Sequence, residues 1–469
     1  MAEQVSSADA ISDAMNGMDV EATMLDDDGE MMVEDDGDDD GGGDDGDDGD
    51  LEEDDDNEEN HDDDEEEEEE VPVEDLAAHV LEAHSDSVYA CAICPQTLAV
   101  LTGGGDDKAF LFRTSDRFQQ PIVLDGHTDS VTCVGFSHDG QLAATGSYDG
   151  RVQIWVSATG ARERLLEGPS DVEWLQWHPK GDVLLAGAQD GTCWMWLARS
   201  GECLRVFAGH DGAVLCGTFT CDGKGLATGS ADGTVRVWAP KKGTCKHTFG
   251  PETTAASGQF TSGAVTMLAA HPSDPDLLIA AAEDGCAAVL HLKSKRVVAL
   301  LPHSTQVSDK NVHLSAADRR AELEDDLDAG ASLAVVAVGL AAAPPTWAAT
   351  GGVDGALKIW DFSGTAPRCR ASCAHGAAVT ALQWHPSEPR LYSSSADRCV
   401  RLWDARSGVC LHVLTGHGDV VLALSVAFSH HRVDLSAEQK GASTDVVLSA
   451  GDDHTARVFD VDVAALQAA

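Results

Sequence analysis

The first 75 residues of this 469-residue chain contain no lysine or arginine, although they hold 38 aspartates and glutamates. They also have too few apolar side chains to offset the entropy of folding, so we expect a disordered, strongly acidic tail over residues 1–76. Like charges repel along such a segment and extend it. Its densest stretch, DDDNEENHDDDEEEEEE, occupies residues 54–70. This composition is compatible with two roles, namely a tail that keeps the protein soluble and a segment that attracts a basic partner electrostatically.

Three further absences narrow the class of protein. The longest small-apolar run, at 331–344, is too short to span a bilayer. The first residues lack the basic start and apolar core of a signal peptide. The 13 cysteines form no paired framework, and the C-x-x-C at 91–94 lacks the second pair that such a zinc site needs. We therefore expect reduced thiols, no bound metal, no membrane insertion, and a cytoplasmic protein that can also enter the nucleus.

Past residue 76 the chain repeats itself. A unit such as TGSYDGRVQIW (145–155) recurs as TGSADGTVRVW (228–238), with an Asp six residues before an aromatic or apolar end. Short alternating runs such as SVTCVGFS (130–137) lie between these units and are bounded by turn residues, which is the pattern of regularly spaced strands. Eight units carry this aspartate, namely Asp106, Asp149, Asp190, Asp232, Asp284, Asp354, Asp397 and Asp453.

A histidine stands 22 residues ahead of four of these aspartates. We expect the histidine, on the loop before a blade, to hydrogen-bond the aspartate in the turn between two strands. The same residue types could suggest a hydrolase triad, but a constellation that recurs from unit to unit is architecture rather than a catalyst. The units of Asp190 and Asp284 lack the loop histidine, so packing must hold them. The four predicted structural pairs are His84–Asp106, His127–Asp149, His210–Asp232 and His375–Asp397.

These units resemble the WD-repeat family, in which each repeat forms one four-stranded blade of a β-propeller. The Trp-Asp pairs at 360–361 and 403–404 carry the literal signature. The resemblance implies an all-β, eight-bladed propeller over residues 77–465. The segment AAHVLEAH (77–84) would close the ring by adding the outer strand of the last blade. Insertions interrupt the rhythm at about 304–330 and 430–445, and residues 466–469 form a C-terminal tail.

Four stretches are similar to the angio-associated migratory cell protein family in particular. They are TGGGDDKAFLFR (102–113), GHTDSVTCVGFSHDG (126–140), DVEWLQWHPKGDVLLAGAQDGTCWMW (171–196) and VRLWDARSG (400–408). The insertion at 304–330 is not part of the family pattern. Fungal relatives of this family act as a dedicated chaperone for one basic large-subunit ribosomal protein, whereas animal relatives are linked to cell migration and receptor signalling. The resemblance therefore implies a binding protein and leaves its client open.

Acidic residues recur in the loops that enter the blades and beside the Asp-containing turns, which share one face of a propeller. We expect this face to bind a basic client, with aromatic side chains stacking on Arg or Lys. An Asp at the third loop position can instead cap its own turn, and Trp174 can equally be a core residue. The predicted partner-binding residues are Asp86, Tyr89, Asp107, Asp129, Asp171, Glu173, Trp174, Asp211, Glu283, Asp419 and Asp452.

The sequence thus predicts a monomeric, non-enzymatic chaperone or escort of a basic large-subunit ribosomal protein, with no cofactor. A WD-repeat scaffold in signalling or cell migration is the alternative, and a histone chaperone comes third. The chain has no Gly-rich phosphate loop at a strand–helix junction, which argues against an enzyme. It has no basic stripe, which argues against direct binding of nucleic acid. Salt separates the alternatives, because the complex of an acidic chaperone weakens steeply with salt and an apolar scaffold contact does not.

Overall fold

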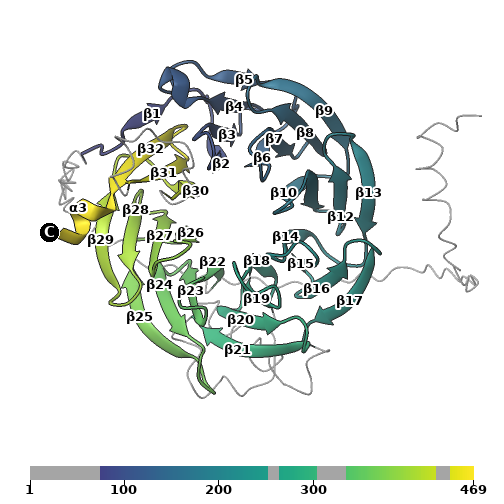
Figure 1. Ribbon diagram of the computed structural model, residues 1–469, viewed down its shortest axis with the longest axis vertical. Helices are drawn as coiled ribbons and strands as arrows, with labels where there is room; N and C mark the ends of the chain where they lie inside the picture. The colour runs from purple at the N-terminus through teal and green to yellow at the C-terminus, as the bar shows by residue number, and fades with distance from the viewer. Residues whose placement is uncertain (1–73, 252–262, 304–333, 429–443, 469) are drawn as a thin grey trace, which may run out of the picture. The chain divides into compact units, whose positions relative to one another are not determined.

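The computed structural model describes residues 74–251, 263–303, 334–428 and 444–468. The predicted acidic tail, up to residue 73, and the predicted insertion at 304–330 lie outside these residues, as does most of the one at 430–445. Within the described residues, strands β1 to β32 form eight four-stranded antiparallel sheets that follow one another around a ring (Figure 1). The predicted eight-bladed propeller is confirmed.

Each of the first four blades uses four strands that are consecutive in the chain. These are β2 (Val88–Ile93), β3 (Val100–Gly104), β4 (Ala109–Phe112), β5 (Ile122–Leu124), β6 (Val131–Phe136), β7 (Leu142–Ser147), β8 (Arg151–Val156), β9 (Ala161–Glu167), β10 (Val172–Trp177), β11 (Val183–Ala188), β12 (Cys193–Leu197), β13 (Glu202–Phe207), β14 (Val214–Phe219), β15 (Leu226–Ser230), β16 (Val235–Ala239) and β17 (Thr244–Phe249). A short 3-10 helix, η1 (Thr114–Asp116), follows β4.

Blades 5 to 7 continue in the same way. They contain β18 (Val265–Ala270), β19 (Leu277–Ala282), β20 (Cys286–His291), β21 (Arg296–Pro302), β22 (Val335–Leu340), β23 (Trp347–Gly352), β24 (Ala356–Asp361), β25 (Arg368–Ala374), β26 (Val379–Trp384), β27 (Arg390–Ser395), β28 (Val400–Asp404) and β29 (Val409–Leu414). Blade 8 contains β30 (Val421–Ala427), β31 (Thr444–Gly451), β32 (Ala456–Asp462) and β1 (His79–Leu81). The chain then forms a short helix, α3 (Val463–Ala468), which spans the end of the predicted propeller at 465 and the start of the predicted tail at 466.

The hydrophobic core lies between neighbouring blades. Every residue of β7 is buried, because both faces of this inner strand pack against other blades, whereas most of the outer strand β9 is exposed. Leu142 and Ile154 of blade 2 pack with Leu184 of blade 3 in one such cluster. Burying apolar side chains of this size stabilises the fold by roughly 1.5–3 kcal/mol each. Blade stacking therefore holds the ring together.

The two ends of the propeller meet in blade 8. Strand β1 pairs antiparallel with β32, with His79 opposite Val458 and Leu81 opposite Ala456. The Arg457 guanidinium binds the Asp75 carboxylate just before β1. This pairing covers the outer edge of β32, so the segment at 77–84 closes the ring as the sequence predicts.

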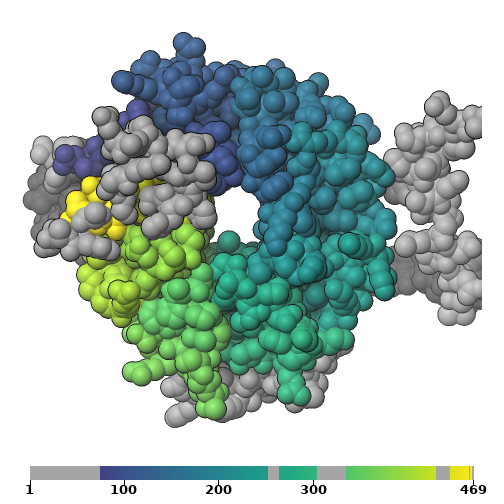
Figure 2. Space-filling view, viewed as in Figure 1, coloured from purple at the N-terminus to yellow at the C-terminus, as the bar shows by residue number. Residues whose placement is uncertain are grey.

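An open channel passes through the centre of the ring (Figure 2). The first strand of each blade borders it (Figure 1). Threonines near the start of these strands tie neighbours together, because Thr132 Oγ1 donates a hydrogen bond to Val172 O at 2.7 Å and Thr380 Oγ1 donates one to Val421 O at 2.7 Å. Of the helices in the described part of the chain, none is long and apolar enough to span a membrane.

Candidate functional site

The His–Asp hydrogen bond joins the loop before a blade to the turn within it. It forms in all four blades where the 22-residue spacing predicts it. The distances from His Nδ1 to the carboxylate are 2.9 Å for His84–Asp106, 3.0 Å for His127–Asp149, 2.8 Å for His210–Asp232 and 3.2 Å for His375–Asp397. Loops and turns therefore share one side of the ring, which we call the entry face.

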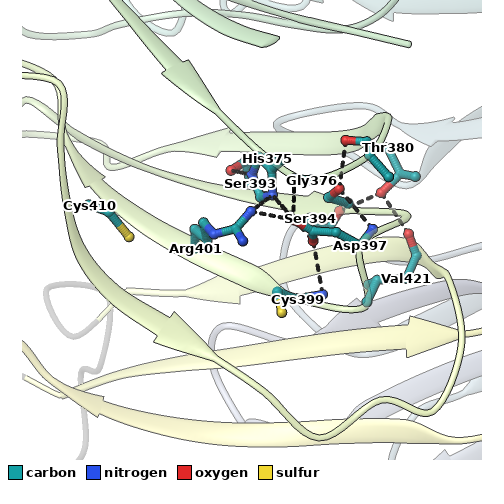
Figure 3. A network of polar contacts seen from close by, with 12 residues as sticks. His375, Gly376, Thr380, Ser393, Ser394, Asp397, Cys399, Arg401, Cys410 and Val421 are labelled. Carbon is teal, nitrogen blue, oxygen red and sulfur yellow. Dashed lines mark hydrogen bonds and ion pairs between the residues drawn. The ribbon is translucent and has the colours of Figure 1, made fainter. Parts of the chain in front are cut away.

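The His375 network shows how these contacts position the loop (Figure 3). His375 Nε2 lies 2.7 Å from Ser393 Oγ, and the Asp397 carboxylate accepts a hydrogen bond from Gly376 N at 2.8 Å. The Arg401 guanidinium also binds Asp397. Burial and the charge of Arg401 together lower the pKa of His375 by more than Asp397 raises it, so the imidazole stays neutral at pH 7.

The aspartate of the His375 network remains ionised. Burial alone raises the pKa of Asp397, but hydrogen bonds from His375, Gly376 and Arg401 outweigh it and hold the pKa well below its usual range. The same balance applies to Asp232 and Asp453. The His375 network thus combines a neutral ring with a hydrogen-bonded carboxylate, and its contacts anchor the loop.

Two further blades carry the network, which the sequence analysis missed. His303 Nε2 lies 3.2 Å from Asp354 Oδ1, and His417 Nδ1 lies 2.9 Å from Asp453 Oδ2. The pairs are separated by 51 and 36 residues, because the inserted segments lengthen the chain between them. The Gly-His pair at 416–417 was the available signal for the second. In the two blades without a loop histidine, Asp190 accepts hydrogen bonds from Thr192, and Asp284 accepts one from Cys286 N.

One group of side chains has spacing that could suit a metal ion, namely His138, Asp139 and Asp182. A cation of the chain already occupies it. Arg199 Nε lies 2.5 Å from Asp182 Oδ2, and Arg199 Nη2 lies 3.8 Å from Asp139 Oδ2. We therefore interpret this group as a surface ion-pair network.

Two tyrosines and two carboxylates gather on the entry face of blades 1 to 3. Tyr89 is 42% exposed and Tyr148 is 41% exposed. Burial raises the pKa of Tyr148, and the negative charges of Glu173 and Asp171 raise it further, with a smaller contribution from Tyr89. Burial also raises the pKa of Glu173, and Asp171 adds to the effect. We call Tyr89, Tyr148, Asp171 and Glu173 the tyrosine–acid cluster.

The backbone explains why the cluster is presented at the channel. Tyr89 and Glu173 each occupy the irregular position of a strand pairing, between Val88 and Ala90 in β2 and between Val172 and Trp174 in β10. Such bulges redirect a side chain out of the regular alternation. Tyr148 immediately precedes the turn aspartate of blade 2. The sequence analysis missed it, although Ala231 stands at the matching place in TGSADGTVRVW.

Several predicted acidic residues cap their own turns. Asp86, Asp129 and Asp419 are exposed, and each accepts a hydrogen bond at 2.7 Å from the backbone N–H of the next residue. Each of these side chains is exposed, so the capping bond does not exclude contact with a cation. Asp86 also lies against Gly105, the residue that Tyr89 approaches, at the edge of the tyrosine–acid cluster.

The remaining predicted acids are spread around the ring. Asp452 accepts a hydrogen bond from Ser87 Oγ and so links blade 8 to blade 1 beside the cluster. Asp211 and Glu283 are exposed on blades 4 and 5, and Asp107 is half-buried in the turn of blade 1. The structure thus concentrates acids near blades 8, 1, 2 and 3 and distributes the others.

Trp174 is held by packing. Its Nε1 donates a hydrogen bond to Val214 O at 2.9 Å, across the boundary between blades 3 and 4. Its ring lies so close to Gly187 and Gly217 that a Cβ at either glycine would overlap it. Of the two interpretations that the sequence left open, this geometry favours the core residue over the partner contact.

Comparison with known proteins gives a consistent assignment. The model of the family "WD domain, G-beta repeat" matches six segments, at residues 77–113, 118–156, 160–196, 201–239, 367–404 and 408–460. Angio-associated migratory cell protein from Canis lupus familiaris and from Homo sapiens are each 33% identical to the chain over 380 residues. Each alignment covers 81% of this chain and 78% of the relative.

Solved structures share the architecture. The crystal structure of Saccharomyces cerevisiae Sqt1 superimposes with a TM-score of 0.69 at 21% identity, covering 83% of this chain and 100% of that one. Sqt1 from Chaetomium thermophilum, in a structure bound to the N-terminus of the ribosomal protein L10, has a TM-score of 0.65 at 20% identity, with the same coverage. At these identities the likeness is one of fold.

Proposed function

Because the chain belongs to the angio-associated migratory cell protein family of WD-repeat proteins, we propose that it is a non-enzymatic escort that captures a basic protein client on its entry face. The client class that fits best is a basic large-subunit ribosomal protein on its way to ribosome assembly. The escort acts as a monomer in the cytoplasm and can accompany its client into the nucleus. It needs no cofactor.

The tyrosine–acid cluster is the observation that carries this proposal. Exposed tyrosine rings beside Asp171 and Glu173 offer both charge and an aromatic face to an Arg or Lys side chain. Burial and the charge of Asp171 raise the pKa of Glu173, which means that both disfavour its ionised form. A cation that approaches this carboxylate offsets both effects and stabilises the ionised form. A basic segment that lies across the channel opening would meet these groups first.

The strength of such capture comes from many weak contacts. A single exposed ion pair contributes only about 0.2–1 kcal/mol. Asp86, Asp129 and Asp452 extend the acidic surface around the cluster. The full chain carries a formal net charge of −52. A field of this sign accelerates association with a basic partner and weakens as salt screens it. The distant structural similarity to Sqt1 bound to a ribosomal protein supports the same client class.

A peptide titration tests the proposal. We would measure fluorescence anisotropy of an Arg- and Lys-rich peptide with the full chain at low and moderate salt. The double variant Asp171→Asn/Glu173→Gln should weaken binding by about tenfold, as expected for the loss of two partly buried partners. The matched control Asp182→Asn/Glu202→Gln removes two carboxylates outside the cluster and should leave affinity unchanged. Equal effects of the two variants would reject the cluster as the client site.

A scaffold in signalling or cell migration is the second candidate, and the name of the animal relatives, which refers to migratory cells, favours it. A scaffold would use apolar contacts on the propeller, and its complexes would survive moderate salt. The titration separates the two functions, because only the escort requires a steep dependence on salt.

A further inference from the structure

A second charged surface, of opposite sign, lies at the outer edge of blades 3 to 5. Its exposed cations come from outer strands and from the turns that lead into them. Arg205 Nη2 donates a hydrogen bond to Lys241 O at 3.0 Å, so β13 of blade 3 reaches the β16–β17 turn of blade 4. We call this set the basic rim, and it consists of Arg205, Lys241, Lys242, Lys246 and Lys295.

The rim continues into blade 5. His247 follows Lys246 in β17, and burial lowers its pKa, with the charge of Lys295 lowering it further. Lys295 lies in the β20–β21 turn of blade 5, and blade 5 follows blade 4 around the ring (Figure 1). Residues separated by up to 90 positions in the chain form one surface, which is why no basic stripe is visible in the sequence.

Among the described residues, none of the five cations of the rim forms an ion pair. The nearby Asp222 is engaged by Lys224 at 3.4 Å, and Glu202 is the exposed acid at the start of β13. In a chain with 82 acids and 30 bases, five neighbouring cations that have no ion-pair partner among the described residues indicate a surface that can bind an anion.

An apolar groove opens beside the rim, between blades 3 and 4. It has a volume of about 390 Å³. Met195, Leu204, Phe219 and Pro240 form its apolar lining, and Arg205 and Lys241 stand at the same groove. Arg205 donates hydrogen bonds to Leu204 O and Lys241 O, which hold its exposed guanidinium at the groove. The groove therefore offers a pocket for one apolar side chain with cations arranged around it.

We infer that the groove and the basic rim bind an acidic peptide segment that carries an apolar side chain. The apolar side chain enters the groove against Leu204 and Phe219, and flanking carboxylates meet Arg205, Lys241 and Lys242. This site is separate from the client site proposed above and takes a partner of opposite charge. One propeller can then hold a basic protein on its entry face and an acidic one at its edge, which is the arrangement of an adaptor between the two.

The aromatic inventory favours a peptide over RNA. Single-stranded nucleic acid is held by exposed aromatic rings on which bases stack. The three tyrosines lie on other blades, at residues 89, 148 and 392, and Trp194 and Trp196 stack on each other inside blade 3. Phe219 at the groove is 4% exposed, so it can contact a side chain at the groove floor but cannot serve as a stacking platform.

Anisotropy titrations with three fluorescent probes test the inference on the full chain. The probes are a seven-residue peptide with six Glu around one Leu, the same peptide with Ser in place of Leu, and a single-stranded uridine oligonucleotide. We expect the Leu peptide to bind about fivefold more tightly than the Ser peptide, because part of the Leu side chain leaves water. Lys241→Glu/Lys242→Glu should weaken the Leu peptide by about tenfold, since attraction is replaced by repulsion.

Matched variants make the result decisive. Arg368→Glu/Arg406→Glu changes charge equally at exposed sites on blades 6 and 7 and should leave the Leu peptide unaffected. Leu204→Ser should abolish the preference for Leu over Ser while it retains the salt dependence. None of these changes should alter binding of the basic peptide at the entry face. Three outcomes would each overturn the inference. The first is equal affinity for the two peptides, and the second is an equal loss of affinity in both charge variants. The third is tighter binding of the oligonucleotide than of the Leu peptide, abolished by Lys241→Glu/Lys242→Glu.

Discussion

His303 hydrogen-bonds Asp354 through Nε2, as His127 hydrogen-bonds Asp149 through Nδ1, although 51 residues separate the first pair and 22 the second. In both blades the other ring nitrogen meets a strand threonine, Thr350 in one and Thr145 in the other. The number of residues between the histidine and the aspartate therefore does not decide whether the network forms. The positions of the loop and the turn at its two ends decide it. A loop entering a blade can lengthen without loss of the anchor, which is how an insertion is accommodated in a closed ring.

The network makes a direct prediction for stability. Asp149→Ala removes the partner of a buried histidine and should lower the free energy of unfolding by about 1–3 kcal/mol. The side chains of His127 and Asp149 are 0% and 3% exposed, so water cannot replace the bond. Asp190→Ala is the matched control and should cost about 0.5 kcal/mol, because that aspartate is exposed and, within the described residues, hydrogen-bonds only Thr192. Urea denaturation measures both, and equal losses would show that the network does not stabilise the blade.

The histidines also predict how stability depends on pH. Burial lowers the pKa of His84, His127 and His375 from the ordinary value of 6.5. Unfolded chains bind protons at these rings near pH 6.5 while folded chains do not, so stability is level above that pH and falls as the pH drops below it. The low pKa of Asp232 and Asp397 adds a second loss below their ordinary value of 3.8.

Urea midpoints at pH 7.5, 6.0 and 5.0 measure the first of these losses. The decline should begin between the first two values, and His375→Gln should flatten part of it. His454→Gln changes an exposed histidine and serves as the control. Glu173 acts in the opposite direction, because its raised pKa favours the folded state as the carboxyl is protonated. A midpoint that rises steadily from pH 7.5 to 5.0 would contradict the account.

Ring closure is testable by truncation. A chain that starts at residue 82 lacks β1 and Asp75, whereas a chain that starts at 74 keeps both. Losing the buried Leu81 and the pairing with β32 should lower the stability of the shorter chain by about 3 kcal/mol relative to the longer one. The open edge of β32 should also promote association between chains. Thermal unfolding with light scattering measures both effects, and identical behaviour of the two chains would show that β1 is dispensable.

Variants of Trp174 and Tyr148 should distinguish a side chain that contributes to stability from one that contributes to peptide binding. Trp174→Phe loses the hydrogen bond to Val214 O and should cost about 1 kcal/mol of stability without weakening a basic peptide. Tyr148→Ala should weaken binding of the basic peptide with little loss of stability, because the ring is 41% exposed and lies beside Asp171 and Glu173. Anisotropy and denaturation on the same two variants give the comparison. If Trp174→Phe weakened peptide binding and Tyr148→Ala did not, Trp174 would be a client contact.

Much of the fold could be predicted because the repeat is local. The aspartate turn, the alternating strands and the 22-residue spacing lie within single units, so eight blades and four network pairs follow from the sequence. His303 and His417 were missed because inserted segments break that spacing. Tyr148 was missed because its neighbours Asp171 and Glu173 come from the next blade. Arg205 and Lys295 form one surface only after three blades stack, and no pattern along the chain contains that contact.

The most direct test of the central claim is affinity purification of the full chain from cell extract at low and moderate salt, with mass spectrometry of the bound proteins. We predict one basic large-subunit ribosomal protein at a stoichiometric level, reduced by moderate salt and lost in Asp171→Lys/Glu173→Lys. The matched Asp182→Lys/Glu202→Lys variant should retain it. Signalling proteins that survive the salt wash, with no ribosomal protein enriched and no effect of either variant, would contradict the escort function and leave a scaffold.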